Sequence, residues 1–471
     1  MTTTFLLRDD SRLNPQVAQV WVAGWINAGE SSADGKTAME VLQADGSFGD
    51  ARPKAVPFQL VSAVPKVSLS VATNGDDRLL FVVSPSQPPS LEVFTTKIEK
   101  KNAAGAVTAT VYRYDARQYT QYPYANAPGV AAPGPFDVFE FGMNAQDNVS
   151  SVSGFGINLS FSVTIKGVLE QFGANISVSR AAIGTAFGKF IANEAKTLPG
   201  ATAFASLLYD GPIMAGAPTP PLVSGQYFAL ADPNDMLAAL SGNYVNPIDH
   251  PLTSFWDETL LAFFKVGNQL SINLNANPSD KKIYSGACSV QTNPTTKVAS
   301  PAYTLSRNGI SFTFYMPLAA GQTLPGQTGA QYVFQQAFGA LTPAGAADDA
   351  GLLQDCIWEA LCRGVALDGV SATAISQGES TTAWNSPATW YQAGKASHLY
   401  GKFLHYATVD GTDSRAGGTP IMYGNAAYGF SMDENPLGPY SGTSVPPKTY
   451  ENVPDGSTVT LVVGPWDAAL A

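Results

Sequence analysis

A chain of 471 residues is long enough for two or three domains, or for one large domain with an insertion. Its 26 basic and 37 acidic side chains give a net charge of −11, which makes nucleic acids and anionic membranes poor partners. With 45% hydrophobic residues, 13% charged residues, 44 Gly and 33 Pro, the composition is typical of many short strands joined by turns.

Few residues of this sequence are suited to disulfides, metals or cofactors. Cys356 and Cys362 are expected on different faces of one helix as buried free thiols, and three cysteines are too few for a disulfide framework. The sequence has no Cys-x-x-Cys, P-loop or dinucleotide motif, so neither a metal nor a cofactor is expected. No apolar stretch reaches the roughly eighteen residues of a membrane span, and residues 1–10 do not resemble a signal peptide.

The first 165 residues are predicted to be mainly strands. Short β-type runs occupy residues 17–24, 67–72 and 79–83, and residues 119–135 are expected to form a long loop. The clearest strand spans Ser153 to Ile165, because apolar and polar residues alternate strictly along it.

Helices are expected in the middle of the chain. The predicted helices lie at residues 179–196, 232–242, 254–266, 347–364 and 396–406, with strands at 270–274 and 311–315. In the third helix, Ser254 and Asp257 have the spacing of a capping box. The tail returns to β structure at residues 457–463.

This order predicts a mainly β protein with a mixed α/β insertion. Residues 1–165 and 410–471 would form a discontinuous β-barrel or sandwich, and residues 166–409 would form the inserted domain.

Two carboxylate sites are candidates for chemistry. On strand alternation, Glu140 shares a face with Phe136 and Val138, so it is either a cleft residue or a solvated side chain on an exposed strand. Asp433 and Glu434 are adjacent acids in a loop, which are often simply solvated.

Paired acids of this kind are what glycoside hydrolysis requires, and aromatic side chains could serve as platforms for sugar rings. Such aromatics are also common in cores. The candidates are Trp384, Trp390, Tyr391, Tyr423 and Tyr428.

The sequence resembles glycoside hydrolase family sixty-four, the laminaripentaose-producing β-1,3-glucanases related to thaumatin-like proteins. The resemblance is carried by motifs that follow the family's order along the chain. These motifs are Gln19–Gly24, Phe136–Phe141, Asn148–Gly156, Phe255–Asp257 with Ser285–Gly286, Arg363–Ala366, Tyr400–His405 and Tyr428–Glu434.

The resemblance implies a thaumatin-like β-barrel and a mixed α/β domain that form an open acidic groove for a β-1,3-glucan, which an endo-acting enzyme would cleave with inversion. Glu140 occupies the position of the general acid, and Asn144 and Asn148 lie where substrate would bind. Ser153 stands where the family has the aspartate that acts as the general base. A serine hydroxyl cannot accept the proton of water in this way near neutral pH.

Three explanations for Ser153 follow from the sequence. Asp147 could supply the base, Asp433 or Glu434 could supply it from across the groove, or the protein binds glucan without cleaving it. The function is therefore expected to be that of an inverting β-1,3-glucanase or of a non-catalytic glucan-binding or structural protein. The resemblance also implies secretion, although residues 1–10 contain no signal peptide.

Overall fold

The computed structural model describes most of the chain. The described residues are 2–27, 39–49, 55–70, 77–102, 106–117, 119–120, 130–142, 147–209, 229–240, 250–274, 282–294, 297–317, 333–334, 348–373, 384, 386–425, 429–430 and 451–467.

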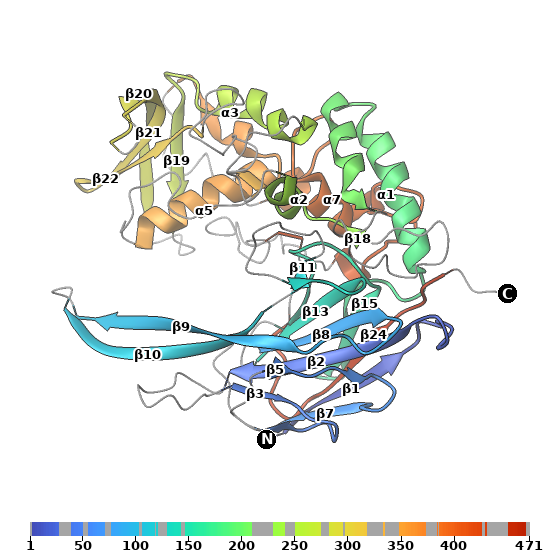
Figure 1. The fold of residues 1–471 in the computed structure, drawn as a ribbon. Helices are drawn as coiled ribbons and strands as arrows, with labels where there is room; N and C mark the ends of the chain where they lie inside the picture. Colours follow the sequence, from blue (N-terminus) through green and yellow to red (C-terminus); the bar gives the residue numbers. More distant parts are fainter. Residues whose placement is uncertain are drawn as a thin grey trace.

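Two facing β-sheets form the lower layer of the molecule in Figure 1. The first has the order β16 (Val168–Gly173), β15 (Leu159–Ile165), β24 (Thr458–Val463), β1 (Thr3–Asp9) and β7 (Lys66–Leu69). The second has the order β14 (Asn148–Ser150), β13 (Phe136–Phe141), β8 (Asp77–Ser84), β2 (Gln19–Asn27), β3 (Met39–Leu42) and β4 (Phe48–Gly49), with β6 (Gln59–Leu60) on β2. The described strands therefore form a sandwich, and no closed barrel occurs among them.

The two sheets bury a common apolar core. Alternate residues of each strand point inward, as Phe5 of β1, Phe81 of β8, Phe139 of β13 and Phe161 of β15 do. The parallel pairing of β1 with β24 joins the two ends of the chain, with Phe5 opposite Val459. Residues from both ends thus contribute to one core, although the exact domain boundaries at 165, 166, 409 and 410 stay a prediction.

A second apolar cluster covers the outer face of the second sheet. It contains Trp25, Leu80 and Phe136, and it is covered by a long hairpin and a short pair of strands. The hairpin consists of β9 (Leu91–Lys101) and β10 (Val107–Ala116), with β5 (Ala55–Val56) on β9, and the short pair is β11 (Tyr119–Thr120) and β12 (Val130–Ala131). In Figure 1 the hairpin runs far out to the left of the sandwich.

The inserted region lies above the sandwich in Figure 1 and has its own core. Its sheet has the order β22 (Ile310–Tyr315), β21 (Ala299–Arg307), β20 (Ile283–Thr292), β19 (Gln269–Asn273) and β23 (Val370–Ser371), and β17 (Leu208–Tyr209) pairs with β18 (Ala229–Leu230). Its α-helices are α1 (Arg180–Glu194), α2 (Pro233–Leu240), α3 (Asp257–Phe263), α5 (Asp348–Cys362) and α7 (Leu399–Tyr406). Its 3-10 helices are η1 (Pro199–Leu207), η2 (Pro251–Ser254), η3 (Ala366–Gly369) and η4 (Pro387–Thr389), with η5 (Ser414–Ala416) and η6 (Tyr423–Asn425) further along the chain.

Most of the predicted helices are confirmed, but the predicted capping box is wrong. Helix α1 begins after Ser179, whose side chain accepts a hydrogen bond from the Ala182 N–H. Helix α3 begins at Asp257, after Trp256, which makes no side-chain cap. Ser254 is instead the last residue of η2, and its hydroxyl donates to the Pro251 carbonyl. Cys356 and Cys362 are buried and form no disulfide, as predicted, and the same holds for Cys288.

The predicted strand from Ser153 to Ile165 is too long, because only Leu159–Ile165 is a strand. The buried carboxylate of Asp137 accepts hydrogen bonds from the Gly156 and Ile157 N–H groups, which are then not free to join a strand ladder. Of the helices that the structure describes, none has both the length and the apolar character that a membrane crossing needs.

Candidate functional site

A pocket of about 220 Å³ lies on the outer face of the second sheet. It is lined by parts of β8 and β13, by Tyr119 and by the turn that follows β14. The lining residues are Arg78, Tyr119, Phe136, Asp137, Val138, Glu140, Ser150, Val152, Ser153 and Gly154. All of these lie before residue 166, so the described part of the insertion lines none of this pocket.

Strand alternation directs Glu140 toward this pocket. On β13, Phe139 and Phe141 belong to the inner core, whereas Val138 packs with the outer cluster. Glu140 therefore lies on the outer face together with Phe136 and Val138, as the sequence pattern predicts.

Glu140 has charged and polar neighbours on both adjacent strands. Arg78 on β8 lies directly opposite it, and its Nη2 is 3.0 Å from Glu140 Oε1. On the other neighbouring strand, β14, Asn148 lies directly opposite Glu140. Its Nδ2 donates to Glu140 Oε2 at 3.4 Å, which is long for a hydrogen bond. The Glu140 side chain is 28% exposed and that of Arg78 is 17% exposed, so the ion pair lies at the pocket wall and still reaches solvent.

Ser153 is exposed at the rim of the same pocket, in a turn that the insertion holds in place. The Gly154 N–H donates to the Ser151 carbonyl, and Gly154 has a φ of 105°, a conformation that glycine adopts without strain. Tyr400 of α7 donates its hydroxyl to the same Ser151 carbonyl at 2.8 Å, and Phe155 pairs with Leu230 of β18. The turn thus brings Ser153 to the same pocket as Glu140.

Asp137 borders the pocket, but its carboxylate is buried on the other side of β13. The Ile157 N–H donates to Asp137 Oδ2 at 2.6 Å and the Gly156 N–H donates to it at 3.1 Å. Burial raises the pKa of Asp137 well above its usual value, while those two N–H groups and the charge of Arg180 act in the opposite direction. Asp137 is therefore a structural carboxyl.

Asp147 is also away from the pocket, so the hypothesis that it replaces the missing base is wrong. It is buried and accepts a hydrogen bond from the Gly142 N–H at 3.2 Å, and its backbone pairs with Glu451. Because Asn148 reaches Glu140, the side chain of Asp147 lies on the opposite face of the strand pair. Burial, with smaller contributions from the charges of Asp77 and Glu451, raises the pKa of Asp147 to about 8.

The predicted sugar platforms in the insertion are wrong, because Trp384, Trp390 and Tyr391 are all buried. Trp390 donates its ring N–H to the Trp384 carbonyl and stacks under the guanidinium of Arg363, 3.9 Å from the ring centre. Tyr391 packs against His405 and Tyr406. These rings complete the insertion core and cannot meet a polysaccharide.

Several of the sequence candidates lie outside the described residues. They are Asn144, Tyr428, Asp433 and Glu434. Among the described residues, no group of three or more His, Cys, Asp and Glu side chains is placed to hold a metal ion.

Sequence reasoning missed Arg78 and Tyr119 as pocket residues. Arg78 follows Asp77 at the start of an apolar run, where a charged pair is usually the solvated end of a strand. Only the register of β8 against β13 places Arg78 opposite Glu140, and that register joins segments far apart in the sequence.

A larger pocket of about 790 Å³ lies in the insertion, between η1, α3 and the segment after α5. Its wall is largely apolar and includes Leu198, Phe255 and Leu361, with Glu258 and Lys395 as its ionic groups. Lys395 is already paired with Asp368 at 2.6 Å. The pocket at Glu140 therefore remains the better candidate for recognition of a polar ligand.

Comparison with solved structures identifies the fold. The chain is similar to a β-1,3-glucanase domain of glycoside hydrolase family sixty-four from Clostridium beijerinckii, with a TM-score of 0.53 and 15% identity over 98% of both chains. It is also similar to the laminaripentaose-producing β-1,3-glucanase of the same family from Paenibacillus barengoltzii, with a TM-score of 0.47 and 15% identity over 98% of this chain and 75% of that one. No protein-family model matches the sequence, and a search of curated proteins gives no match either. At this identity the first similarity shows a shared fold.

Proposed function

We propose that this protein binds β-1,3-glucan, that one glucosyl unit of the chain occupies the pocket at Glu140, and that the glucan is not cleaved. The choice of ligand rests on the fold, since the similar structure from Clostridium beijerinckii is described as a β-1,3-glucanase domain. The pocket volume of about 220 Å³ is below the roughly 300–1,000 Å³ that encloses a whole drug-sized ligand. A single sugar unit of a longer chain suits this volume.

The pocket wall offers suitable partners for sugar hydroxyl groups. The Arg78–Glu140 pair supplies charged donors and acceptors side by side, and Ser153 adds a hydroxyl at the rim. Val138 and Phe136 supply apolar surface for the carbon face of the ring.

The observation that favours binding over cleavage is the absence of a second suitable carboxylate among the described pocket residues. Inverting hydrolysis needs an acid and a base about 6.5–9.5 Å apart with a water between them. The carboxylate of Asp137 is turned into the sandwich, Asp147 does not line the pocket, and the position of the base is Ser153. Glu140 is also engaged in an ion pair, since Arg78 Nη2 lies 3.0 Å from its Oε1.

Inverting hydrolysis with Glu140 as the general acid is the second candidate function. The specific observation in its favour is that Glu140 faces the pocket and is partly exposed there, with Ser153 at the same rim. In this alternative Asp433 or Glu434 would act as the base.

Binding and cleavage can be scored separately with curdlan, laminarin and a β-1,4-glucan control. We expect sedimentation with curdlan and retardation by laminarin in affinity gels, no binding to the β-1,4-glucan, and no release of reducing ends. Reducing ends that disappear in Glu140→Gln would establish the hydrolase instead. Absence of binding to any β-1,3-glucan would overturn both candidates.

A gain-of-function variant tests the role of position 153. Ser153→Asp restores a carboxylate at the pocket rim, and we expect it to release reducing ends from laminarin at a low rate. Ser153→Asn is the matched control, because it has nearly the same shape without the charge. Since a general base contributes roughly 10²–10⁴-fold, an Asp variant no more active than the Asn variant would show that the pocket cannot position the attacking water.

A further inference from the structure

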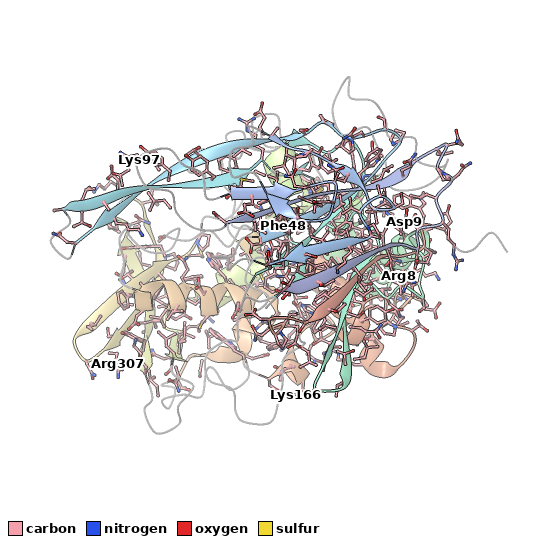
Figure 2. All side chains as sticks on the ribbon, turned by 90° about the horizontal axis from the view of Figure 1, so that it is seen from below. Arg8, Asp9, Phe48, Lys97, Lys166 and Arg307 are labelled. Carbon is pink, nitrogen blue, oxygen red and sulfur yellow. The ribbon has the colours of Figure 1, made fainter. Side chains whose placement is uncertain are left out.

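The hairpin of β9 and β10 forms an arm that extends beyond the sandwich. The strands pair from Val93 opposite Ala116 at the base to Lys101 opposite Val107 near the tip. In Figure 1 the arm runs out on the same side as the sheet of the insertion, and Figure 2 shows Lys97 on the arm and Arg307 on that sheet toward the same side. Two-stranded ribbons are marginally stable alone in water. The surface of an arm of this length is therefore a candidate for binding.

One face of the arm carries two tyrosines. Tyr112 lies opposite Lys97 and Tyr114 lies opposite Thr95, and alternation places all four on the same side of the ribbon. We call these four residues the tyrosine face. Tyr112 and Tyr114 are both partly exposed. The opposite side carries Phe94, which is 41% exposed.

The tyrosine face and the wall of the Glu140 pocket pack against the same apolar cluster. Tyr114 packs against the outer cluster of the second sheet, and so does Val138. Val138 lines the pocket, as do Tyr119 and Phe136, which are members of that cluster. The same buried apolar cluster therefore contacts both the pocket wall and Tyr114, and Tyr112 follows two residues farther along the arm.

The charge on this face suits a neutral ligand. The Nζ atom of Lys97 is 2.9 Å from Glu99 Oε1, so the two charged side chains compensate each other. A tyrosine ring offers a flat apolar surface and a hydroxyl at its edge, which matches a sugar ring with its C–H face and its hydroxyl rim. An acidic or basic polymer would meet no net opposite charge at this pair.

We infer that one β-1,3-glucan chain binds at both places: one of its glucosyl units occupies the Glu140 pocket, and further units bind to the tyrosine face. This inference rests on the proposed function. The arm then makes affinity depend on chain length, because only a long chain reaches from the pocket to Tyr112.

The experiment compares three variants with two ligands by calorimetry. Tyr112→Ala removes the ring, Tyr112→Phe keeps it, and Phe94→Ala removes a ring from the opposite side of the same arm. We expect Tyr112→Ala to bind laminarin about tenfold more weakly, the effect of about 1.4 kcal/mol, and to bind laminaritriose like the unchanged protein. Phe94→Ala should bind laminarin within a factor of about two of the unchanged protein, and Tyr112→Phe should lose less affinity than Tyr112→Ala because it keeps the ring.

The outcomes separate this inference from the proposed function. If the unchanged protein binds laminarin and Tyr112→Ala binds it equally well, the arm has no part in binding and only this inference fails. The same follows if Phe94→Ala weakens binding as much, because the loss would then come from the arm's structure. If laminarin and laminaritriose do not bind to the unchanged protein, both the inference and the proposed function fail.

Discussion

Asp137 and Glu140 lie on the same strand, β13, but on its two different faces. Asp137 points into the sandwich, where two backbone N–H groups donate to its carboxylate. Glu140 points outward to a pocket, where it pairs with Arg78. The role of a carboxyl group in this protein therefore does not follow from its residue type or its strand. It follows from the face of the sheet on which the side chain lies and from the hydrogen-bond donors on that face.

The largest expected effect concerns the inner carboxyl. Asp137→Ala leaves the Gly156 and Ile157 N–H groups buried without acceptors, and each such loss costs about 1–3 kcal/mol. We expect the free energy of unfolding in urea to fall by about 2–4 kcal/mol. Asp137→Asn is the matched control and should lose less, because the amide oxygen still accepts. Equal losses in both variants would mean that the hydrogen bonds to Oδ2 do not organise the segment after β14.

The sequence could predict the face of Glu140 because strand alternation is a local property. It could not predict the partner of Glu140, since Arg78 meets it only through the pairing of β8 with β13. The strand expected from Ser153 failed for a similar reason: the apolar pattern is local, but the carboxylate that takes the N–H groups of residues 156 and 157 belongs to β13.

The aromatic residues of the insertion also show that exposure of a side chain cannot be predicted from the local sequence. Trp390 and Tyr391 looked suitable as sugar platforms, but exposure depends on what packs against a ring. The guanidinium of Arg363 covers Trp390, and His405 and Tyr406 cover Tyr391. Conversely, the tyrosine face of the arm becomes apparent only when the register of β9 and β10 is known.

A smaller effect, with a pH dependence, is expected at Asp147. The pKa of this buried carboxyl in the folded state is about 8, above the usual 3.8, so the folded protein holds a proton that the unfolded chain releases. The free energy of unfolding should therefore fall as the pH rises from about 4 to about 8. Asp147→Asn removes this dependence and keeps an oxygen for the Gly142 N–H.

Thermal or urea unfolding of Asp147→Asn between pH 4 and pH 9 checks this prediction. At pH 8 we expect the variant to be more stable than the unchanged protein by more than about 1 kcal/mol, with little difference at pH 4, because each unit of the pKa shift corresponds to about 1.4 kcal/mol. Asp137→Asn serves as the comparison at another buried carboxyl. An unchanged pH slope in Asp147→Asn would mean that water reaches this side chain or that Asp77 and Glu451 take up the proton instead.

The smallest effect on stability is expected at Glu140. Its ion pair with Arg78 is partly exposed, and such pairs contribute about 0.2–1 kcal/mol. Glu140→Gln should therefore lower the free energy of unfolding by less than about 1 kcal/mol, and 1 M NaCl should reduce the difference, because salt screens exposed charges. The loss in Asp137→Ala should persist in salt, since it comes from buried hydrogen bonds. If Glu140→Gln instead destabilises the protein as much as Asp137→Ala does, then Glu140 is a structural residue like Asp137. The main argument for a binding site in the adjacent pocket would then fail.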